Sequence, residues 1–371
     1  MRRFTGFLMA AVAATALAAA AHAQDVVVAT AGPLTGGDAV FGEQMKKGAE
    51  MAVADINAAG GLLGKKLKLE LGDDQCEPKQ ALPVANSFVQ KKVVFVAGHF
   101  CSGVSIPASA VYAENNILQI SPASTNPKFT DDPAKKGIKT VLRTCGRDDI
   151  QGLIAGKWIA EKYKGKKLAV LHDKTPYGQG IADEVKKAYN GAGGKEALYD
   201  SFQKGDKDFT ALISKMKSMT LDVVYVGSYH TEVGLMVKQA REQGFKAQFI
   251  SEDALVTEEF WKIAGPAGEG LLMTFAPDPI ASPAAKAVVE KFTKAGYKPE
   301  GYTLYTYAAF QVYAAAVKAA KSFDPQKVAA QIHGKTFETV LGKLIYDNKG
   351  DVSNSNYVWY TWTKDGKYKQ L

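Results

Sequence analysis

Short apolar runs alternate with amphipathic stretches along the chain, which predicts strands followed by helices. Apolar residues recur at helical spacing over residues 42–57, and glycines between residues 60 and 64 end this predicted helix. Two further helices are predicted at 78–91 and 104–114, and a loop with proline and serine follows the last strand of this part. The predicted strands are 26–31, 67–72, 93–97 and 117–120. A regular succession of strand and helix favours a parallel sheet covered on both faces.

A second series of the same kind begins after residues 140–143. It predicts strands at 167–171, 197–200, 222–226 and 247–250. The helices that alternate with them are predicted at 150–163, 177–190, 208–218 and 231–243. The chain closes with helical sequence at 301–321 and 325–332 and strand-like sequence at 343–346 and 357–362. A chain of 371 residues is too long for one average core, so the two series predict two α/β lobes.

The first 23 residues are expected to be removed before the protein folds. Two arginines precede an uncharged apolar stretch at 7–20, which ends in Ala21-His22-Ala23. This is the pattern of a secretory signal peptide, with cleavage before Gln24. The apolar stretch is shorter than the ~20 residues of a transmembrane helix, and no later run reaches that length. We therefore expect a soluble protein of the periplasm.

The chain carries 46 Lys and Arg against 38 Asp and Glu, a formal net charge of +8. A basic protein can bind nucleic acid when its cations gather in one patch. Here the lysines are dispersed in Lys-Lys pairs beside predicted strands and helix ends. We therefore expect no nucleic-acid partner and interpret these lysines as solvated surface charge.

Three cysteines follow the predicted signal peptide, and export places them in an oxidising compartment. Cys76 and Cys101 each lie just beyond a strand-like run, and the ends of adjacent parallel strands are close enough for a disulfide. Their pairing would stabilise the fold by roughly 3.5 kcal/mol in the chain-entropy description. Two free buried thiols are the alternative. Cys145 is expected to be unpaired and buried.

Common catalytic and cofactor motifs do not occur in the sequence. Residues 29–37, after the first predicted strand, contain neither GxGxxG nor GK[ST]. There is no HExxH, no Cys/His pair at zinc spacing and no GxSxG. We expect no cofactor, no metal and no enzymatic activity, with a secreted enzyme as an alternative from a different class. Two open α/β lobes favour a ligand cleft at the carboxyl ends of the strands.

Several loops at these strand ends carry recognisable motifs. In the first lobe they are Val-Ala-Asp-Ile-Asn at 53–57, Asp-Asp-Gln-Cys-Glu-Pro-Lys-Gln-Ala at 73–81, Gly-His-Phe-Cys-Ser at 98–102 and Ser-Pro-Ala-Ser-Thr at 121–125. In the second lobe they are Leu-Arg-Thr at 142–144, His-Asp-Lys at 172–174, Tyr-Gly at 177–178 and Tyr-His at 229–230. In this order they resemble the branched-chain amino-acid binding proteins of bacterial ABC importers, the leucine-isoleucine-valine type, over nearly all of the chain after the signal.

The resemblance implies a type I periplasmic binding fold, an α/β architecture in which two Rossmann-like lobes joined by three hinge crossings close over the ligand. It places lobe 1 at residues 24–143 and 276–355, and lobe 2 at residues 144–275 and 356–371. Crossings are expected near Thr144, Ala276 and Asn356. The disulfide between Cys76 and Cys101 is also a feature of the family.

The resemblance further implies how the site holds the carboxylate of an α-amino acid. A dry cleft must supply hydrogen-bond donors to that carboxylate. Ser102 and Thr125 match family positions that do so through hydroxyl and backbone N–H groups. Ser102 also lies near the expected start of helix 104–114, whose N-terminus favours an anion. In the alternative interpretation, Ser102 is only a helix cap and Thr125 only a turn residue.

For the ligand ammonium, the matching groups are the carbonyl of Ala123 and a carboxylate of the second lobe. Here the chain departs from the family pattern. By spacing from Phe249, the expected glutamate falls on Asp253, with Glu252 one residue earlier. Either acid is the candidate partner of the ammonium, and the alternative for both is a helix cap or a surface charge.

Aromatic residues from positions that line the family's cleft, or lie beside it, are expected to meet the ligand side chain. They are Phe41, Phe100, Tyr177, Tyr229 and Phe275. Phe41 stands where the family usually has tyrosine, which makes that wall more apolar. Burial in the core is the alternative for each of them.

The resemblance implies a receptor that binds a branched-chain or other aliphatic amino acid between its lobes and delivers it to ABC permease subunits in the inner membrane. We expect it to act as a monomer. The alternative is a receptor of the same fold for another small ligand, such as an aromatic carboxylate or an amide.

Overall fold

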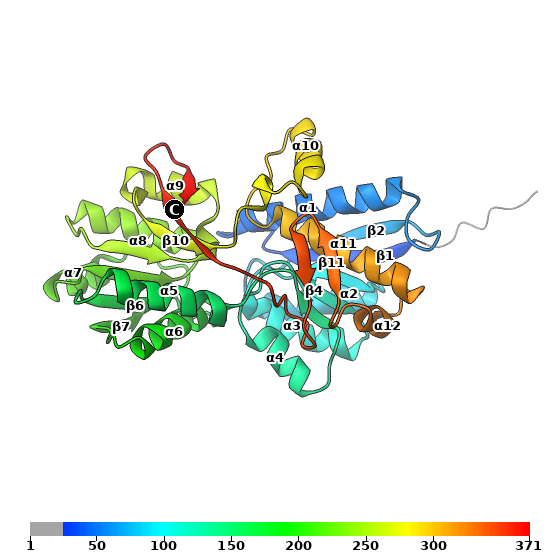
Figure 1. The fold of residues 1–371 in the computed structure, drawn as a ribbon, viewed down its shortest axis with the longest axis horizontal. Helices are drawn as coiled ribbons and strands as arrows, with labels where there is room; N and C mark the ends of the chain where they lie inside the picture. Colours follow the sequence, from blue (N-terminus) through cyan, green and yellow to red (C-terminus); the bar gives the residue numbers. More distant parts are fainter. Residues whose placement is uncertain (1–24) are drawn as a thin grey trace, which may run out of the picture.

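The computed structural model describes residues 25–371, so the predicted signal peptide lies outside the described residues. Two β-sheets stand side by side, each with its own helices, and they define two lobes (Figure 1). The first lobe is built on five parallel strands in the order β2-β1-β3-β4-β5. These strands are β1 (Val26–Gly32), β2 (Leu67–Asp73), β3 (Phe95–Gly98), β4 (Leu118–Ser121) and β5 (Val141–Arg143).

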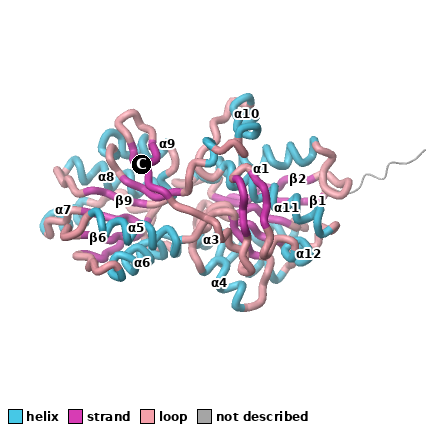
Figure 2. The backbone as a smooth tube through the Cα atoms, viewed as in Figure 1, coloured by secondary structure: helices cyan, strands magenta, loops and turns pink. Residues whose placement is uncertain are grey.

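Helices cover both faces of the first sheet, because its strands are apolar on both sides (Figure 2). Val26 and Val28 face one core, and Ala29 and Ala31 face the other, as alternation along a strand requires. The first core is closed by α1 (Ala39–Ala58), α10 (Lys286–Lys294), α11 (Thr303–Ala320) and α12 (Pro325–Ala330). The second is closed by α2 (Ala81–Gln90) and α3 (Ser102–Glu114).

The second lobe is built on seven strands in the order β14-β13-β10-β9-β8-β6-β7. Five are parallel to one another. Strand β13 pairs antiparallel with β10, and β14 pairs antiparallel with β13. The strands are β6 (Leu168–His172), β7 (Leu198–Ser201), β8 (Val223–Gly227), β9 (Gln248–Ser251), β10 (Leu272–Phe275), β13 (Val358–Trp362) and β14 (Tyr368–Gln370). One face packs against α5 (Asp148–Lys162) and α6 (Pro176–Gly191), and the other against α7 (Thr210–Ser218), α8 (His230–Glu242) and α9 (Glu258–Ala264).

The chain passes between the lobes in three places (Figure 1). Thr144 lies in the first passage, between β5 and α5, and Ala276 in the second, after β10. Asn356 lies in the third, between the hairpin β11 (Thr336–Thr339) and β12 (Gly342–Ile345) and strand β13. Among residues 25–371, no helix combines the length and the apolar character needed to cross a membrane.

The predicted fold class, two α/β lobes with parallel sheets, is confirmed. The predicted loop with proline and serine follows β4 at residues 122–127, but it leads into α4 (Lys128–Lys135), which the sequence did not predict. Only Phe129 and Thr130 of this helix are buried, so its sequence lacks the apolar recurrence that predicts a helix. Helix α9 and strand β10 likewise have no predicted counterpart.

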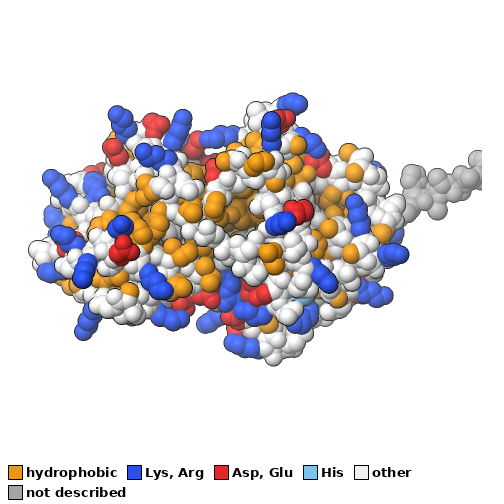
Figure 3. Space-filling model, in the orientation of Figure 1, with side chains coloured by type: hydrophobic (Ala, Val, Ile, Leu, Met, Phe, Trp, Pro, Cys, Tyr) orange, Lys and Arg blue, Asp and Glu red, His pale blue; other side chains and the backbone are white. Residues whose placement is uncertain are grey.

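The predicted disulfide is confirmed: Cys76 and Cys101 are bonded, with their Cα atoms 5.5 Å apart. It ties the loop after β2 to the start of α3. Cys145 is free and buried as expected, and burial raises the pKa of its thiol to about 12. Lys and Arg side chains are scattered among Asp and Glu over the face shown in Figure 3.

Candidate ligand-binding site

Loops at the carboxyl ends of the strands of both sheets face one another across a small cavity of about 10 Å³. Its lining residues are Phe100, Ser102, Ala123, Tyr177, Tyr229, Asp253, Ala254 and Tyr302. All but two of these are residues that the sequence singled out. Tyr302 and Ala254 are the additions.

A larger groove of about 480 Å³ lies beside the passages between the lobes, lined among others by Thr144, Ala276 and Asn356. None of the predicted site residues lines it. We place the candidate site in the smaller cavity because there buried hydroxyls of one lobe face buried carboxyls of the other.

Ser102 lines the cavity from the first lobe, and Thr125 lies outside its lining. Each of the two is 1% exposed. Ser102 is the first residue of α3 and Cys101 is its N-cap, so the alternative that Ser102 is the cap is wrong. The Ser102 hydroxyl accepts the Asn126 N–H at 3.4 Å. Within residues 25–371, Thr125 Oγ1 has no hydrogen-bond partner. A hydroxyl at a helix N-terminus, such as that of Ser102, suits a carboxylate.

Arg143, which the sequence did not assign a role in the site, holds the loop that carries Ala123 and Thr125. It is 0% exposed. Its guanidinium donates to the carbonyl oxygens of Ser124 at 2.5 Å and Asn126 at 2.9 Å. Its charge is balanced by Asp351, at 2.8 Å. A buried arginine with these contacts fixes the position of the loop backbone.

The second lobe contributes two adjacent acids, Glu252 and Asp253, directly after β9. They are 0% and 3% exposed, so a surface position is wrong for both. Glu252 has an extended backbone and caps the 3-10 turn Asp253–Leu255 through its side chain. Its Oε2 accepts the Ala254 N–H at 2.7 Å, and its Oε1 accepts the Ser228 N–H at 3.0 Å. The alternative role of a cap therefore holds for Glu252, while Asp253 lines the cavity.

Two tyrosine hydroxyls hold the carboxylate of Asp253. Tyr177 donates to Oδ1 at 3.0 Å, and Tyr302 donates to Oδ2. The Tyr177 hydroxyl also contacts Glu252 Oε2, so it lies between the two acids. Tyr302 directly precedes α11 of the first lobe, so its bond to Asp253 joins the lobes.

Tyr177 reaches this position because α6 begins abruptly after β6. Thr175 caps the helix by accepting the Gly178 N–H at 2.9 Å, and Pro176 occupies the first helical position. Gly178 lets the helix approach β8 closely, since a Cβ at this position would lie 2.4 Å from the Gly227 carbonyl oxygen. The first turn of α6 therefore presents Tyr177 to the acids.

Within the described part of the chain, residues 25–371, the two buried acids form no ion pair with a cation. Burial raises the pKa of Asp253, and burial together with the charge of Asp253 raises the pKa of Glu252 well above its ordinary value. Arg143 and Lys204 are paired elsewhere, with Asp351 and Asp38. The second-lobe wall is therefore suited to accept a positively charged group.

Aromatic rings complete the walls in two layers. Tyr177 and Tyr229 line the cavity with ring centroids 5.2 Å apart. Phe100 lines the opposite side, with Phe41 stacked flat behind it at 4.4 Å. Phe275 packs edge-on against Tyr302 at 5.9 Å. Phe41 and Phe275 thus support lining rings and do not themselves line the cavity.

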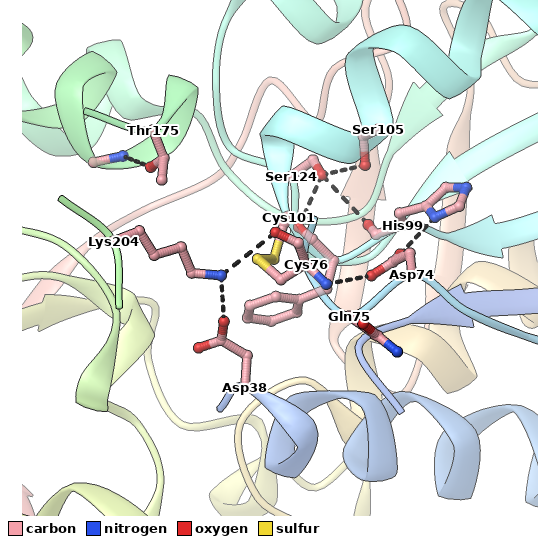
Figure 4. The surroundings of a disulfide bond; sticks show 12 residues. Asp38, Asp74, Gln75, Cys76, His99, Cys101, Ser105, Ser124, Thr175 and Lys204 are labelled. Atoms are coloured by element: carbon pink, nitrogen blue, oxygen red, sulfur yellow. Dashed lines mark hydrogen bonds and ion pairs between the residues drawn. A yellow bond between two sulfur atoms is a disulfide. The ribbon is translucent and has the colours of Figure 1, made fainter. Parts of the chain in front are cut away.

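A contact between the lobes lies beside the disulfide (Figure 4). Lys204 of the second lobe reaches to Asp38 at the start of α1, with its Nζ 2.6 Å from Oδ2. It also donates to the Cys76 carbonyl at 3.4 Å, and its ammonium lies 4.8 Å from the ring centre of Tyr229. Nothing in the sequence pattern indicated this pair, because its partners come from different lobes.

Two α/β lobes with a polar cavity between their carboxyl strand ends define a cleft-forming solute receptor. The family model for periplasmic binding proteins matches residues 25–367, and the chain belongs to this family of solute-binding receptors, which is not an enzyme family. Leu/Ile/Val-binding protein homolog 1 of Brucella suis is 52% identical over 371 residues, which cover 99% of this chain and 98% of that protein.

Solved structures agree with this assignment. The leucine-binding protein LivK of Thermotoga maritima superposes with a TM-score of 0.84 at 29% identity, over 93% of this chain and 97% of that one. LivJ of Streptococcus pneumoniae, solved with isoleucine, gives 0.82 at 28% identity, over 94% and 99%. The resemblance stated from the loop motifs is confirmed.

Proposed function

We propose that this protein binds a branched-chain or other aliphatic amino acid in the cavity between its lobes and delivers it to the permease of an ABC importer. The proposal rests on the different chemistry of the two cavity walls. The Ser102 hydroxyl at the start of α3 faces Asp253, which lies with a second buried acid, Glu252, after β9. An α-amino acid presents an anion and a cation on one carbon, so it matches both walls at once.

In this proposal each group has a role. Ser102 and Thr125 bind the ligand carboxylate, and the carbonyl of Ala123 with Asp253 binds the ammonium. The rings of Phe100, Tyr177 and Tyr229 enclose the aliphatic side chain, and Phe41 and Phe275 hold the lining rings in place. The names of the relatives, which specify leucine, isoleucine and valine, support this ligand class.

An aromatic carboxylate has less support as a ligand. It brings no positive charge, and burying it against Asp253 and Glu252 would place like charges together in a dry site. A zwitterion brings the missing cation.

The proposal includes export and movement. The protein acts in the periplasm as a monomer without enzymatic activity, after cleavage before Gln24. Residues 24–143 with 276–355, and residues 144–275 with 356–371, move as two bodies about hinges near Thr144, Ala276 and Asn356. Closure would give the permease a shape that distinguishes loaded from empty receptor.

Calorimetric titration of the mature protein tests the proposed ligand. Leucine, isoleucine, valine and alanine would be compared with 4-methylpentanoate, which lacks the ammonium of leucine, and with benzoate. We expect at least one aliphatic amino acid to bind, and 4-methylpentanoate to bind more than tenfold more weakly than leucine. Tight binding of benzoate with no binding of the amino acids would contradict the proposal.

A further inference from the structure

We propose that Glu252 and Asp253 share one proton in the ligand-free protein and release it to solvent when the ligand ammonium binds. This inference rests on the proposed function, because the amino-acid ligand supplies the ammonium. It assigns a linked proton to the binding step, and it gives Glu252 a role although Glu252 does not line the cavity.

The contacts of the Tyr177 hydroxyl indicate how many hydrogens it shares with the two acids. Its hydroxyl lies within hydrogen-bond distance of Glu252 Oε2 and of Asp253 Oδ1. A hydroxyl has one proton, so it donates to only one of these oxygens. The other contact is favourable when the second carboxyl carries a proton and donates to the tyrosine oxygen. Three groups in this arrangement hold two hydrogens between them, one from the tyrosine and one from the acid pair.

The remaining neighbours favour a single negative charge on the pair. Two backbone N–H groups stabilise Glu252, and the Tyr302 hydroxyl stabilises Asp253. The other titratable groups that act on the pair come from α5, α11, β8 and its following loop, and the inter-lobe passages. They are Asp148, Tyr225, Tyr229, Tyr305, Tyr357 and Cys145, all neutral or acidic. Within residues 25–371, neither acid forms an ion pair, and Arg143 and Lys204 bond to other acids.

The ligand changes this balance. An ammonium placed beside Asp253 supplies the positive charge that a second carboxylate needs, so both acids ionise. The zwitterion enters with no net charge, and one proton leaves the acid pair for the solvent. Affinity is then expected to rise with pH, by up to about tenfold per pH unit where the release is complete. Burial raises the pKa of both acids, which favours retention of this proton on the pair in the ligand-free protein.

Titration with leucine in buffers of different ionisation enthalpy, such as phosphate and Tris, measures the released proton. We expect the observed enthalpy to change with the buffer by an amount that corresponds to about one proton per leucine near pH 7. Asp148→Asn is the matched control, because burial raises the pKa of Asp148 to about 8 and makes it the competing source. This variant is expected to keep the release. Loss of the release in Asp148→Asn would overturn the assignment to the pair.

A second measurement does not depend on variants that bind ligand. Difference infrared spectra of the wild-type protein should lose a protonated-carboxyl band when leucine is added, and Glu252→Gln and Asp253→Asn should each lack that band in the ligand-free state. Leucine binding with a buffer-independent enthalpy and no such band would overturn this inference and leave the proposed function standing. Absence of binding by every amino acid would instead overturn the proposed function.

Discussion

The two walls of the cleft are built by different means. The first-lobe wall is neutral and covalently tied: the disulfide holds Cys101, and Ser102 follows it at the start of α3. Arg143 fixes the adjoining loop through two carbonyl oxygens. The second-lobe wall has no covalent tie at its acids, which are held by tyrosine hydroxyls and backbone N–H groups. One wall is rigid and uncharged, and the other is titratable.

This difference follows from what each end of the ligand requires. A carboxylate is bound well by neutral donors in a fixed geometry, as at helix N-termini. An ammonium needs acceptors with negative charge, and buried negative charge is costly until the cation arrives. The second wall is therefore the one whose charge state is expected to change on binding.

The largest effect is expected from removing charge at the second wall. Asp253→Asn takes away the carboxylate that meets the ammonium and strands a buried cation, which typically costs about 2 to 5 kcal/mol. Leucine affinity should fall by well over tenfold in calorimetric titration. Glu259→Gln, an exposed acid on α9, is the control and should bind as the unmodified protein does. If both variants bind leucine equally well, Asp253 is not the ammonium partner.

Removing the covalent tie of the first wall is expected to act mainly on stability. Replacing Cys76 and Cys101 together by serine should lower the free energy of unfolding by roughly 3.5 kcal/mol, because the unfolded chain loses a closed loop. Chemical denaturation measures this change. In the unreduced, denatured protein, thiol counting should find one free thiol, that of Cys145. Three free thiols would contradict the disulfide in solution.

The sequence predicted the lining of both walls best where a motif sits directly after a strand. Ser102, Ala123 and Asp253 are of this kind, since strand ends of parallel sheets meet at one edge. Tyr302 was missed because it precedes α11, whose apolar residues face almost all sides and indicate only a core helix. The sequence could not show that Phe41 packs behind the lining rings. An apolar residue beside a strand end can either line the cavity or support the residues that do.

Contacts between distant segments were beyond sequence reasoning. Arg143 lay within a recognised motif, but its bond to Asp351 depends on how the third passage packs against the first lobe. Nothing in the sequence distinguishes Lys204 from the other lysines, because its ion pair with Asp38 forms only between the two lobes. Helix α4 shows the same limit locally, because its buried side is too narrow to produce a periodic apolar pattern.

A smaller loss is expected when a neutral donor is removed from the first wall. Ser102→Ala takes one hydroxyl from a charged ligand group, which is worth about 1.5 to 3 kcal/mol, or roughly ten- to a hundredfold in affinity. Leucine titration should show this loss, and leucinamide, which has no carboxylate, should lose less. Ser109→Ala on the same helix is the control, since that hydroxyl bonds to the Ile106 carbonyl. Equal losses for both ligands would place the carboxylate elsewhere.

The smallest effect is expected at the ion pair between Lys204 and Asp38, which joins the lobes outside the cavity. Lys204→Met keeps the aliphatic stem beside Tyr229 and removes the partly buried ion pair with Asp38. Such a pair contributes on the order of 1 kcal/mol, so leucine should dissociate about fivefold faster while its association rate stays nearly unchanged. Stopped-flow fluorescence measures both rates, with exposed Lys207→Met as the control.

A double-mutant cycle of Lys204→Met with Asp38→Asn should give a coupling free energy of similar size. Zero coupling would mean that the pair does not hold the closed lobes together, and that the two walls alone set the lifetime of the complex.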